Sequence, residues 1–561
     1  MGVITSAHGL RVDASPFPNP HPNRTAATAV VPQPTVVVVS GGSGTPPTVV
    51  LVTSPSTTGY APHAVIAQGF GTTAGSSAIT SYSFNWGDGT AVSNTTKTVN
   101  GSAVPVPIAY HRYTVAGSYT LQLTVTDANG NSVSATRGIV VTAVPSPTVT
   151  INPGTNINGA INGAAAGAII QVNAGVYVAT GSITPKANQV IYANGAVTIS
   201  GNNTVQYGVT PSTVTGVVIR GIRFTAYTQW AFQFGTVGTG GNVTLKDCEL
   251  DTNGTNGTVS GAVNGFNGGV IVFDTCHVHH NRSYNIAGGA QSTIIMIGGE
   301  YDNGFTDTSG AINPNAGDGV WKHVHSDGDY IVGCNIHDNQ GSALWWDGSC
   351  VNMYVCLCTV TNNRGPGVFS EINDAAHGGG ASGTIGTIVG NLDGSGYSVR
   401  WLFNTLSGNG YPATSFFPTG NIYPSNLWVS KSDKIEMAYN WIDGGAHGVT
   451  LDYQVGRPEG HNLANIAVHH NDIRLRETGA SGFGSGAGRV GFHNSVSGTA
   501  YALTNVTFHH NSYYAAHDNG TWQHFIVYTG TSEVNNTFAQ WQANGYDTTG
   551  STMSLDTAWP H

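Results

Sequence analysis

Short stretches of alternating apolar and polar residues run along the chain and give the first indication of its fold. In SYTLQLTVTD (118–127), Tyr119, Leu121, Leu123 and Val125 occupy every second position and therefore share one face of a strand. Similar short segments follow one another over residues 45–143, separated by tight turns such as the GDG of 87–89. This pattern predicts a β-sandwich in which the apolar face of each strand points into a shared core.

The stretches FNWGDGT (84–90) and HRYTVAGSYTLQLTVTDANGN (111–131) resemble the polycystic-kidney-disease (PKD) type of immunoglobulin-like β-sandwich. The resemblance covers residues 45–143 and implies a spacer or adhesive module. Residues 1–44 are rich in Pro, Thr, Val and Gly, and we expect them to form an extended arm or linker. The Pro-bearing segment AVPSPT (143–148) is expected to connect the sandwich to the rest of the chain.

A six-residue template recurs after residue 148 and predicts a different fold. Its form is Cys, any residue, an aliphatic residue, two polar residues and Asn, and it occurs in CELDTN (248–253), CHVHHN (276–281), CNIHDN (334–339) and CTVTNN (358–363). IAVHHN (466–471) and VTFHHN (506–511) are interpreted as variants without the Cys. Twenty-four residues separate Cys334 from Cys358, a repeat length typical of stacked supersecondary units. Because each repeat alternates like a strand, residues 148–561 are predicted to form a parallel β-helix with about 4.8 Å between coils.

The template assigns structural roles to its Cys and Asn residues. Cys248, Cys276, Cys334 and Cys358 occupy one inward position and are expected to form a column of buried free thiols, since parallel in-register strands suit disulfides poorly. The Asn residues that end the template are expected to form a ladder of side-chain amides at a bend. Residues 157–177 are interpreted as a short helix that covers the end of the solenoid, followed by the first coil.

Composition and charge narrow the partners and the location. Only 9% of the 561 residues are charged, 77 are Gly and 40% are hydrophobic, which suits short strands joined by many turns around a large core. The net charge of −10 and the lack of a basic run argue against nucleic acid as a partner. No apolar stretch approaches the roughly 20 residues of a membrane helix. The N-terminus lacks the basic start and apolar core of a secretory signal, so we expect a protein that acts outside the cell as part of a virus particle.

One predicted coil, GSALWWDGSC (341–350), combines two tryptophans with a carboxylate. The 24-residue repeat carries Asp347 onto Glu371, and Lys322 lies 25 residues before Asp347, so these three side chains are expected along one side of successive coils. Trp345 and Trp346 are neighbours in a strand and point to opposite faces, so one is expected in the core and the other at the surface. An exposed aromatic ring beside carboxylates can grip a sugar, because the ring stacks on the apolar sugar face and carboxylates bind hydroxyls.

Residues 316–377, which include KHVH, LWWDGSC and GPGVFSEIN, resemble the right-handed parallel β-helix proteins of the pectate-lyase-like superfamily. The branch in question carries a Lys, then a Gly-(x)-Trp-x-Asp coil, then a Gly-x-x-x-Glu-Ile coil. The similarity spans about residues 148–561. Together with the PKD-like module, it implies a tail-associated protein of a bacteriophage, of the minor tail or tailspike kind. The matching positions here are Lys322, Trp345 or Trp346, Asp347, Gly367, Glu371 and Ile372.

The row of Lys322, Asp347 and Glu371 supports several chemistries that the sequence leaves open. Carboxylates on adjacent coils would lie roughly 5 Å apart, as in a retaining glycosidase, and their like charges would raise the pKa of one of them. Alternatively, Asp347 and Glu371 would hold Ca²⁺ while Lys322 removes the proton α to a uronate carboxyl group, as in lyases with this fold. The third alternative is a structural charge ladder without turnover.

Four further residues are candidates for binding a substrate near this row. Arg282 and Arg364 each follow a template Asn and are candidates to neutralise a uronate. His323 and His325 share a strand face near Lys322 and are candidates to assist proton transfer.

Three pairs of adjacent histidines raise a metal hypothesis. Adjacent strand residues point in opposite directions, so a pair cannot chelate an ion from one face, and the coils that carry the pairs lie far apart in sequence. We therefore expect polar columns stacked at turns and no metal ligands. The pairs are His279–His280, His469–His470 and His509–His510.

The sequence thus predicts an all-β protein whose right-handed parallel β-helix contacts host cell-surface polysaccharide from a phage tail. One alternative is a polysaccharide depolymerase, either lyase or glycoside hydrolase, centred on Lys322, Asp347 and Glu371. Another is a purely architectural tail component. The expected partners are the polysaccharide, other phage tail proteins and further copies of the chain, since spikes with this fold are often trimers. The sequence assigns no definite cofactor, and Ca²⁺ is the candidate that the lyase alternative would use.

Overall fold

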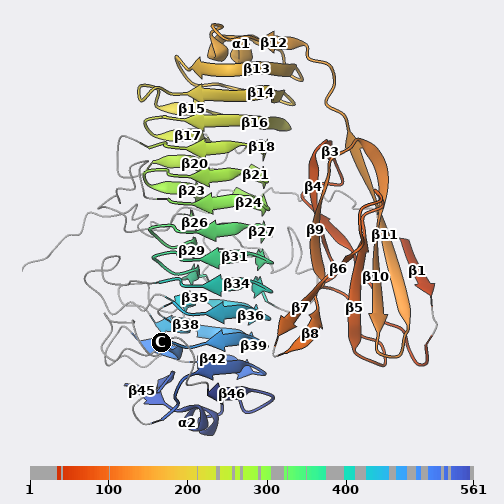
Figure 1. The fold of residues 1–561 in the computed structure, drawn as a ribbon, viewed down its shortest axis with the longest axis vertical. Helices are drawn as coiled ribbons and strands as arrows, with labels where there is room; N and C mark the ends of the chain where they lie inside the picture. Colours follow the sequence, from red (N-terminus) through yellow and green to blue (C-terminus); the bar gives the residue numbers. More distant parts are fainter. Residues whose placement is uncertain are drawn as a thin grey trace, which may run out of the picture.

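The structure is a computed structural model in which a sandwich domain lies beside a long solenoid (Figure 1). It describes residues 35–39, 42–99, 101–211, 213–234, 241–254, 260–265, 269–288, 292–304, 321–324, 326, 328–348, 350, 352–373, 397–410, 425–445, 447–453, 463–476, 488–494, 503–519, 523–528 and 532–555.

The sandwich pairs a sheet of order β1-β11-β10-β5-β6 with a sheet of order β2-β4-β9. Leu121, Leu123 and Val125 of β10 are fully buried between the sheets, as the alternation predicts, together with Phe84 and Trp86. In addition, β3 pairs with β11, and β7 pairs with β8. The strands are β1 (Thr35–Val39), β2 (Val52–Ser54), β3 (Thr58–Tyr60), β4 (His63–Gln68), β5 (Ile79–Asn85), β6 (Ser93–Asn94), β7 (Thr96–Val99), β8 (Ser102–Pro105), β9 (Ile108–Tyr113), β10 (Gly117–Asp127) and β11 (Ser132–Thr142).

Part of the expected N-terminal arm belongs to the sandwich. Strand β1, with the sequence TVVVV, pairs antiparallel with β11 from Thr35↔Thr136 to Val39↔Ser132. A run of β-branched residues favours a strand and covers a sheet edge that would otherwise be open. Residues 1–34 lie outside the described part of the chain.

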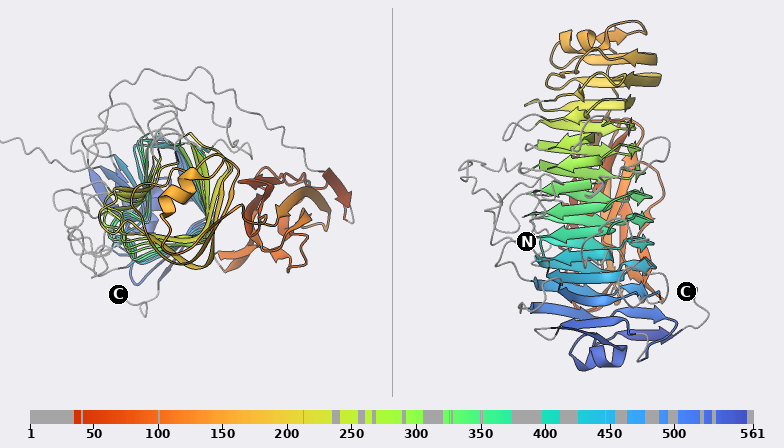
Figure 2. Two further views of the ribbon diagram at one scale, coloured as in Figure 1. Left: turned by 90° about the horizontal axis from the view of Figure 1, so that it is seen from above. Right: turned by 90° about the vertical axis from the view of Figure 1, so that its left-hand side faces the viewer.

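The solenoid is a right-handed parallel β-helix with three faces, as predicted (Figure 2). Its first strands are β12 (Val149–Ile151), β13 (Ile169–Val178), β14 (Val190–Ser200) and β16 (Val217–Thr225), the last three of which run round a bend. Later coils carry a separate strand on each face. Face 1 contains β18 (Asn242–Lys246), β21 (Gly269–Asp274), β24 (Ser292–Ile297), β27 (Tyr330–Val332), β30 (Met353–Cys356), β33 (Val399–Leu402), β36 (Asp433–Ala438), β39 (Leu463–His469) and β42 (Leu503–His509).

Faces 2 and 3 complete each coil. Face 2 contains β19 (Glu249–Asp251), β22 (His277–His279), β25 (Glu300–Asp302), β28 (Asn335–His337), β31 (Thr359–Thr361), β34 (Thr405–Ser407), β37 (Trp441–Asp443), β40 (Asp472–Arg474), β43 (Ser512–Ala515) and β46 (Thr552–Leu555). Face 3 contains β15 (Tyr207–Val209), β17 (Trp230–Gln233), β20 (Gly261–Gly265), β23 (Tyr284–Gly288), β26 (Trp321–Val324), β29 (Leu344–Asp347), β32 (Val368–Glu371), β35 (Ser425–Ser430), β38 (His447–Tyr453), β41 (Val490–Asn494), β44 (Phe525–Tyr528) and β45 (Glu533–Asn536).

Short helices lie at both ends of the β-helix and cover its core. The predicted N-terminal cap is α1 (Ile157–Gly163), whose Ile157 and Ile161 are fully buried. At the other end, α2 (Phe538–Ala543) places the fully buried Trp541 against Phe492 and Phe508. These caps prevent the apolar interior from meeting solvent at its open ends.

The bend between faces 1 and 2 carries the predicted cysteine column and continues it in asparagine. All six cysteines are free and buried. After Cys358, whose backbone N–H donates to Asn404 Oδ1 (3.0 Å), the same bend position is occupied by buried Asn residues linked side chain to side chain at 3.0–3.1 Å. The column consists of Cys248, Cys276, Gly299, Cys334, Cys358, Asn404, Asn440, Asn471 and Asn511, so a glycine interrupts the predicted column of thiols.

The bend between faces 2 and 3 carries a second amide ladder. Here Asn253 donates to Asn281 (3.0 Å). Gly304 takes the next position, and a second stretch follows in which Asn339 donates to Asn363 and Asn363 to Asn409, both at 2.8 Å. An asparagine ladder was predicted, so its existence is confirmed.

The prediction that IAVHHN and VTFHHN repeat the CHVHHN template is wrong. His279 ends a face 2 strand, whereas His469 and His509 end face 1 strands, so the two groups lie at different bends. Both bends use a left-handed residue followed by a buried Asn, as at His280 (φ 50°) and His470 (φ 53°). The local sequence of a bend therefore does not reveal which bend it forms.

The sandwich packs along face 1 of the β-helix (Figures 1 and 2). Ala64, Ile66, Val106 and Ile108 share an apolar cluster with residues of β21, β24, β27, β30, β33 and β36. Polar contacts surround the cluster: Lys246 Nζ donates to the carbonyls of Tyr60 and Pro62, Arg112 pairs with Asp274 (3.0 Å), and Lys97 Nζ donates to the carbonyl of Phe403 (2.7 Å). The domain is thus docked on the solenoid and does not hold it at a distance.

Candidate functional site

The predicted row of site residues lies on the outer surface of face 3. Along each strand, side chains point alternately into the core and toward the outside. Leu344 and Trp346 of β29 point into the core. One outward column runs through Lys322, Trp345, Phe369 and Trp428, and a second runs through Val324, Asp347, Glu371 and Ser430. Lys322 is therefore opposite Trp345, and the residue opposite Asp347 is Val324, two positions after Lys322. Lys322 and Asp347 nevertheless lie on the same outer surface.

The three residues of the predicted row are joined through Trp345. Lys322 Nζ lies 3.6 Å from the centre of the Trp345 ring and 3.1 Å from Asp347 Oδ2. The Lys322 and Asp347 side chains retain 16% and 14% exposure, so solvent reaches this pair. Trp345 Nε1 donates to Glu371 Oε2 (3.0 Å), and Glu371 is fully buried. The structure thus brings Lys322, Asp347 and Glu371 together. Lys322 contacts Asp347 and the Trp345 ring, and Trp345 donates a hydrogen bond to the buried Glu371.

The prediction of one surface tryptophan is wrong, because both rings are buried. Trp346 points into the core and donates from Nε1 to Asp329 Oδ2 (2.8 Å). Trp345 points outward, but it is only 7% exposed and stacks on Phe369, which stacks on Trp428. Aromatic side chains of neighbouring coils thus cover one another and leave the Lys322 end of the column as its accessible part.

His323 does not lie on the surface that carries Lys322. It follows Lys322 directly in β26, so it points into the core, where it is fully buried. Its Nδ1 lies 2.6 Å from Asp329 Oδ2 and its Nε2 lies 2.7 Å from Ser292 Oγ. This placement differs from the predicted substrate contact and gives His323 a part in a buried polar network. His325 lies outside the described residues.

The two predicted arginines lie at the bend between faces 2 and 3, on different coils. Arg364 directly precedes the coil of β32, and its Nη1 donates to Gln340 Oε1 (3.3 Å). Arg282 is exposed on the coil of β23, three coils earlier. Neither arginine has a described contact with Lys322, Asp347 or Glu371, so their substrate role stays a prediction.

The outward column of Asp347 and Glu371 continues beyond the predicted row. It passes through Ser430 to Asp452 and His493 on β35, β38 and β41. Asp452 is fully buried, and His493 Nδ1 lies 2.5 Å from Glu533 Oε1. The sequence did not reveal these residues, because insertions of unequal length between the later coils remove the 24-residue spacing.

A small hollow opens on face 3 near the same column. It is lined by His447, Thr450, Arg489 and His493, among others. Burial, together with the charges of Arg489 and His493, lowers the pKa of His447 to about 3. His447 is therefore neutral in neutral solution.

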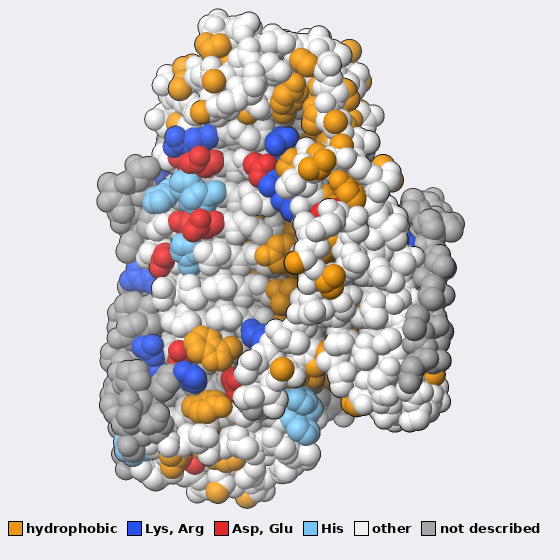
Figure 3. Space-filling view, turned by 45° about the vertical axis from the view of Figure 1, so that its right-hand side comes forward, with side chains coloured by type: hydrophobic (Ala, Val, Ile, Leu, Met, Phe, Trp, Pro, Cys, Tyr) orange, Lys and Arg blue, Asp and Glu red, His pale blue; other side chains and the backbone are white. Residues whose placement is uncertain are grey.

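Face 2 carries a separate column of charged and histidine side chains, seen as alternating blue, red and pale blue in Figure 3. Arg223 donates from two nitrogens to Asp251 (2.7 and 2.6 Å), and His277 Nε2 lies 2.7 Å from Asp302 Oδ1. Burial opposes ionisation of His277, but the hydrogen bond and charge of Asp302 outweigh it and raise the pKa of His277. Two groups in this column have the ligand types and proximity of a metal site: Glu249, Asp251 and His279, and Glu300, Asp302 and His337.

The fold defines an N-terminal PKD domain followed by a right-handed parallel β-helix. Residues 45–143 match the family model of the PKD domain. Among solved structures, the PKD1 domain of Vibrio anguillarum Epp is 23% identical over 18% of this chain and 99% of its own, with a TM-score of 0.14.

Two β-helix structures are similar over most of the chain, at low identity. The Agl-KA catalytic domain is 10% identical and covers 93% of this chain and 89% of its own, with a TM-score of 0.41. The A-module of the mannuronan C-5 epimerase AlgE4 of Azotobacter vinelandii is 10% identical and covers 73% of this chain and 98% of its own, with a TM-score of 0.31. No curated protein matches the sequence. Among the described residues, no helix is long and apolar enough to cross a membrane.

Proposed function

We propose that face 3 of the β-helix binds a polysaccharide at the surface formed by Lys322, Trp345 and Asp347. The observation that carries this proposal is the solvent-reached ion pair of Lys322 and Asp347 beside the edge of a stacked aromatic column. An ammonium group and a carboxylate bind sugar hydroxyls. Trp345 positions Lys322 for this role, because the ammonium group lies over its ring. A long parallel array of coils also presents such groups along the path of an extended chain.

Cleavage of the bound polysaccharide is the second candidate function, and the pairing of Asp347 with Glu371 favours it. The two residues are directly opposite on adjacent strands, which lie about 4.8 Å apart. Retaining glycosidases use two carboxyl groups at roughly this separation. The different burial of Asp347 and Glu371 also suits two carboxyl groups with different roles.

In the lyase alternative, Lys322 would accept the proton α to a uronate carboxyl group. Lys322 contacts a carboxylate and the face of an indole, both of which attract a positive charge. These contacts suit a cation that binds the hydroxyl or carboxylate groups of a sugar better than they suit a base. Ca²⁺ held by Asp347 and Glu371 would belong to the same alternative and is tested with it.

We further propose that the protein works on a phage tail, outside the host cell, with other tail proteins and copies of itself as partners. This setting rests on the resemblance of residues 316–377 and of the PKD segment. Electron microscopy of virions labelled with an antibody against the β-helix tests it: label along the tail is expected, and virions without label would contradict it.

Binding and cleavage are tested together with purified envelope polysaccharides, with and without Ca²⁺. We expect the wild-type chain to bind at least one polysaccharide, and Lys322→Met and Asp347→Asn each to weaken binding at least tenfold. The matched control is Arg474→Met, because Arg474 lies over the Trp441 ring on face 2, 5.3 Å from its centre, and should leave binding unchanged. Reducing ends report hydrolysis, and absorbance of unsaturated uronates reports a lyase.

Two outcomes would contradict the proposal. One is that the wild-type chain binds none of the polysaccharides. The other is that binding survives both face 3 substitutions or falls equally in Arg474→Met. Binding without new reducing ends or absorbance would retain the proposed binding and refute the cleavage candidate.

A further inference from the structure

Two of the histidine pairs lie on successive coils and form one cluster. Strands β39 and β42 are neighbours on face 1 and pair His469 with His509. The His469 and His509 rings are parallel, with centres 4.9 Å apart, and the His470 and His510 rings are parallel at 4.8 Å. The expected stacking of polar columns at a turn is therefore confirmed for these two pairs. Their separation of 40 residues in sequence does not keep them apart, because β39 and β42 are paired strands.

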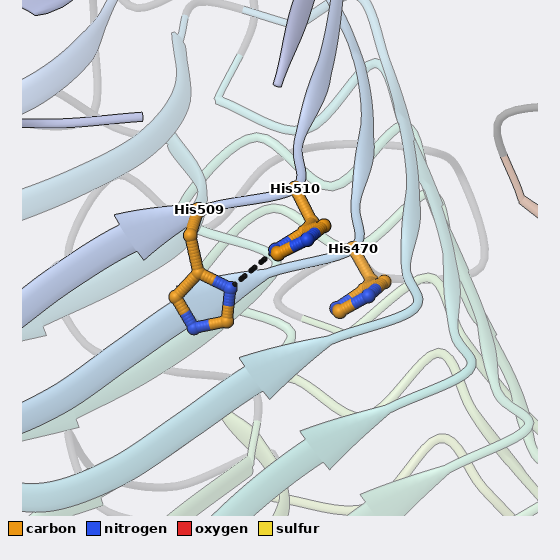
Figure 4. A group of neighbouring side chains, drawn as sticks. All are labelled: His470, His509 and His510. Atoms are coloured by element: carbon orange, nitrogen blue, oxygen red, sulfur yellow. Dashed lines mark hydrogen bonds between the residues drawn. The ribbon is translucent and has the colours of Figure 1, made fainter. Parts of the chain in front are cut away.

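The rings of His509 and His510 lie toward the same side of the bend, and the ring of His470 lies beside that of His510 (Figure 4). His470 and His510 have φ values of 53° and 54°, so the alternation of an extended strand ends at His469 and His509. The Nδ1 atoms of His469 and His470 are 2.9 Å apart, and those of His509 and His510 are also 2.9 Å apart. The argument that adjacent residues must point in opposite directions fails at this left-handed position.

The resulting group has the donor set of a transition-metal site. One ring nitrogen from each of His470, His509 and His510 lies within 4.8 Å of the others. With nitrogen–metal distances of about 2.0–2.1 Å, two ligands at right angles are about 2.9 Å apart, and two tetrahedral ligands are about 3.3 Å apart. The separation within the His509–His510 pair therefore fits two cis ligands of one ion.

The three rings are half-buried, so solvent and a dissolved ion can reach them. Neutral imidazole is the form that binds a metal ion.

We propose that His470, His509 and His510 bind one divalent transition-metal ion, of the Cu²⁺ or Ni²⁺ type. Imidazole nitrogens favour these ions over Mg²⁺ and Ca²⁺, which take oxygen ligands. Three protein ligands leave positions for water or a further ligand. The site lies on the bend between faces 1 and 2 and is separate from the sugar-binding surface proposed on face 3.

The two carboxylate–histidine groups of face 2 are weaker candidates. In the first, Asp251 already accepts two hydrogen bonds from Arg223. In the second, Asp302 is paired with His277. An incoming dication would have to displace these partners. In the third group, the His470 ring stacks on Tyr439 and on His510, and stacking leaves the in-plane ring nitrogens of His470 directed away from those two neighbours.

The test is calorimetric titration of the full-length chain, without a histidine tag, with NiCl₂ or CuCl₂. We expect one metal ion per chain to bind tightly. His470→Asn and His510→Asn should each lower this affinity at least tenfold. Asn adopts the left-handed conformation readily, so both variants keep the bend. Thermal melting of the metal-free variants within about 3 °C of wild type verifies that the fold is intact. The Cu²⁺-loaded wild type should also show nitrogen hyperfine coupling by electron paramagnetic resonance.

His280→Asn is the matched control. It alters the same His–His–Asn motif, with Nδ1 atoms 2.7 Å apart, but Thr252 and Asn303 take the places of stacked histidines on the neighbouring coils. This variant should retain the wild-type affinity. The proposal is overturned if no stoichiometric binding occurs, if His510→Asn binds like wild type, or if His280→Asn loses the same equivalent.

Discussion

Replacing Asn440 with Ala would interrupt the amide ladder between faces 1 and 2. Asn440 is fully buried, and its Oδ1 accepts from the backbone N–H (3.0 Å) and the side-chain amide (3.1 Å) of Asn404. Its Nδ2 donates to Trp401 O (2.9 Å) and Asn471 Oδ1 (3.0 Å). Alanine removes all four bonds. Each buried polar group left without a partner costs about 1–3 kcal/mol, and a water molecule in the vacated space replaces some of the bonds, so we expect a loss of about 3–5 kcal/mol.

Thermal and urea unfolding followed by near-ultraviolet circular dichroism would measure this loss. For a unit of about 400 residues, 4 kcal/mol corresponds to a fall in Tm of about 5 °C. The control is Asn335→Ala, which removes a half-buried outward side chain of β28 and should change the unfolding free energy by less than about 0.5 kcal/mol. Equal shifts in the two variants, or an unchanged Tm for Asn440→Ala, would refute the reasoning that the ladder stabilises the coils.

Three further predictions concern pH, docking and thiols. Burial alone would raise the pKa of Glu436, but His469 and Arg400 outweigh it and lower this pKa to about 2. The contribution of Glu436 to the free energy of unfolding, roughly 3 kcal/mol, is therefore present above pH 4.5 and lost as pH falls toward 2. Glu436→Gln should flatten the dependence of stability on pH in this range. An unchanged slope in the variant would exclude the ion pair as the source of that dependence. Ile66→Asp places a carboxylate in the apolar cluster between the sandwich and face 1 and should increase the maximum dimension of the molecule in small-angle scattering. The control Val140→Asp changes an exposed residue and should leave that dimension unchanged. Unchanged scattering from both variants would contradict apolar docking. All six thiols are buried, and burial raises the pKa of Cys350 to about 12, so a thiol reagent should label the native chain at least tenfold more slowly than the unfolded chain.

The sequence predicted those features that depend on regular spacing. Strand alternation identified the buried face of β10, and the interval from Cys334 to Cys358 identified stacked coils. The same interval placed Asp347 beside Glu371, because no insertion separates β29 from β32 in the repeat. These relations follow from the two-residue period of a strand and from the constant length of neighbouring coils.

Other features depend on interactions that a repeat does not encode. Trp345 is buried where its ring stacks on Phe369, which in turn stacks on Trp428. Trp428 lies beyond an insertion of irregular length, so the repeat does not indicate this column. The histidine pairs were misassigned because a left-handed residue changes the direction of the following side chains, and both bends accept the same His–His–Asn sequence. The packing of the PKD domain on face 1 joins segments that are remote in sequence, and no local pattern indicates it.

The position of the PKD domain determines how the molecule would transmit mechanical load. Because the sandwich folds back alongside the coils, a pull between strand β1 and the C-terminal cap acts partly along the plane of the docking contact, as shear. Polar contacts are spread along that surface, and under shear they would bear the force together instead of breaking one after another. They are made by Arg112, Lys246 and Lys97. The docked domain also shields the middle of face 1 from other copies of the chain. Lateral assembly of several rods would therefore have to use the two remaining sides, which carry the face 2 histidine column and the face 3 sugar-binding candidate.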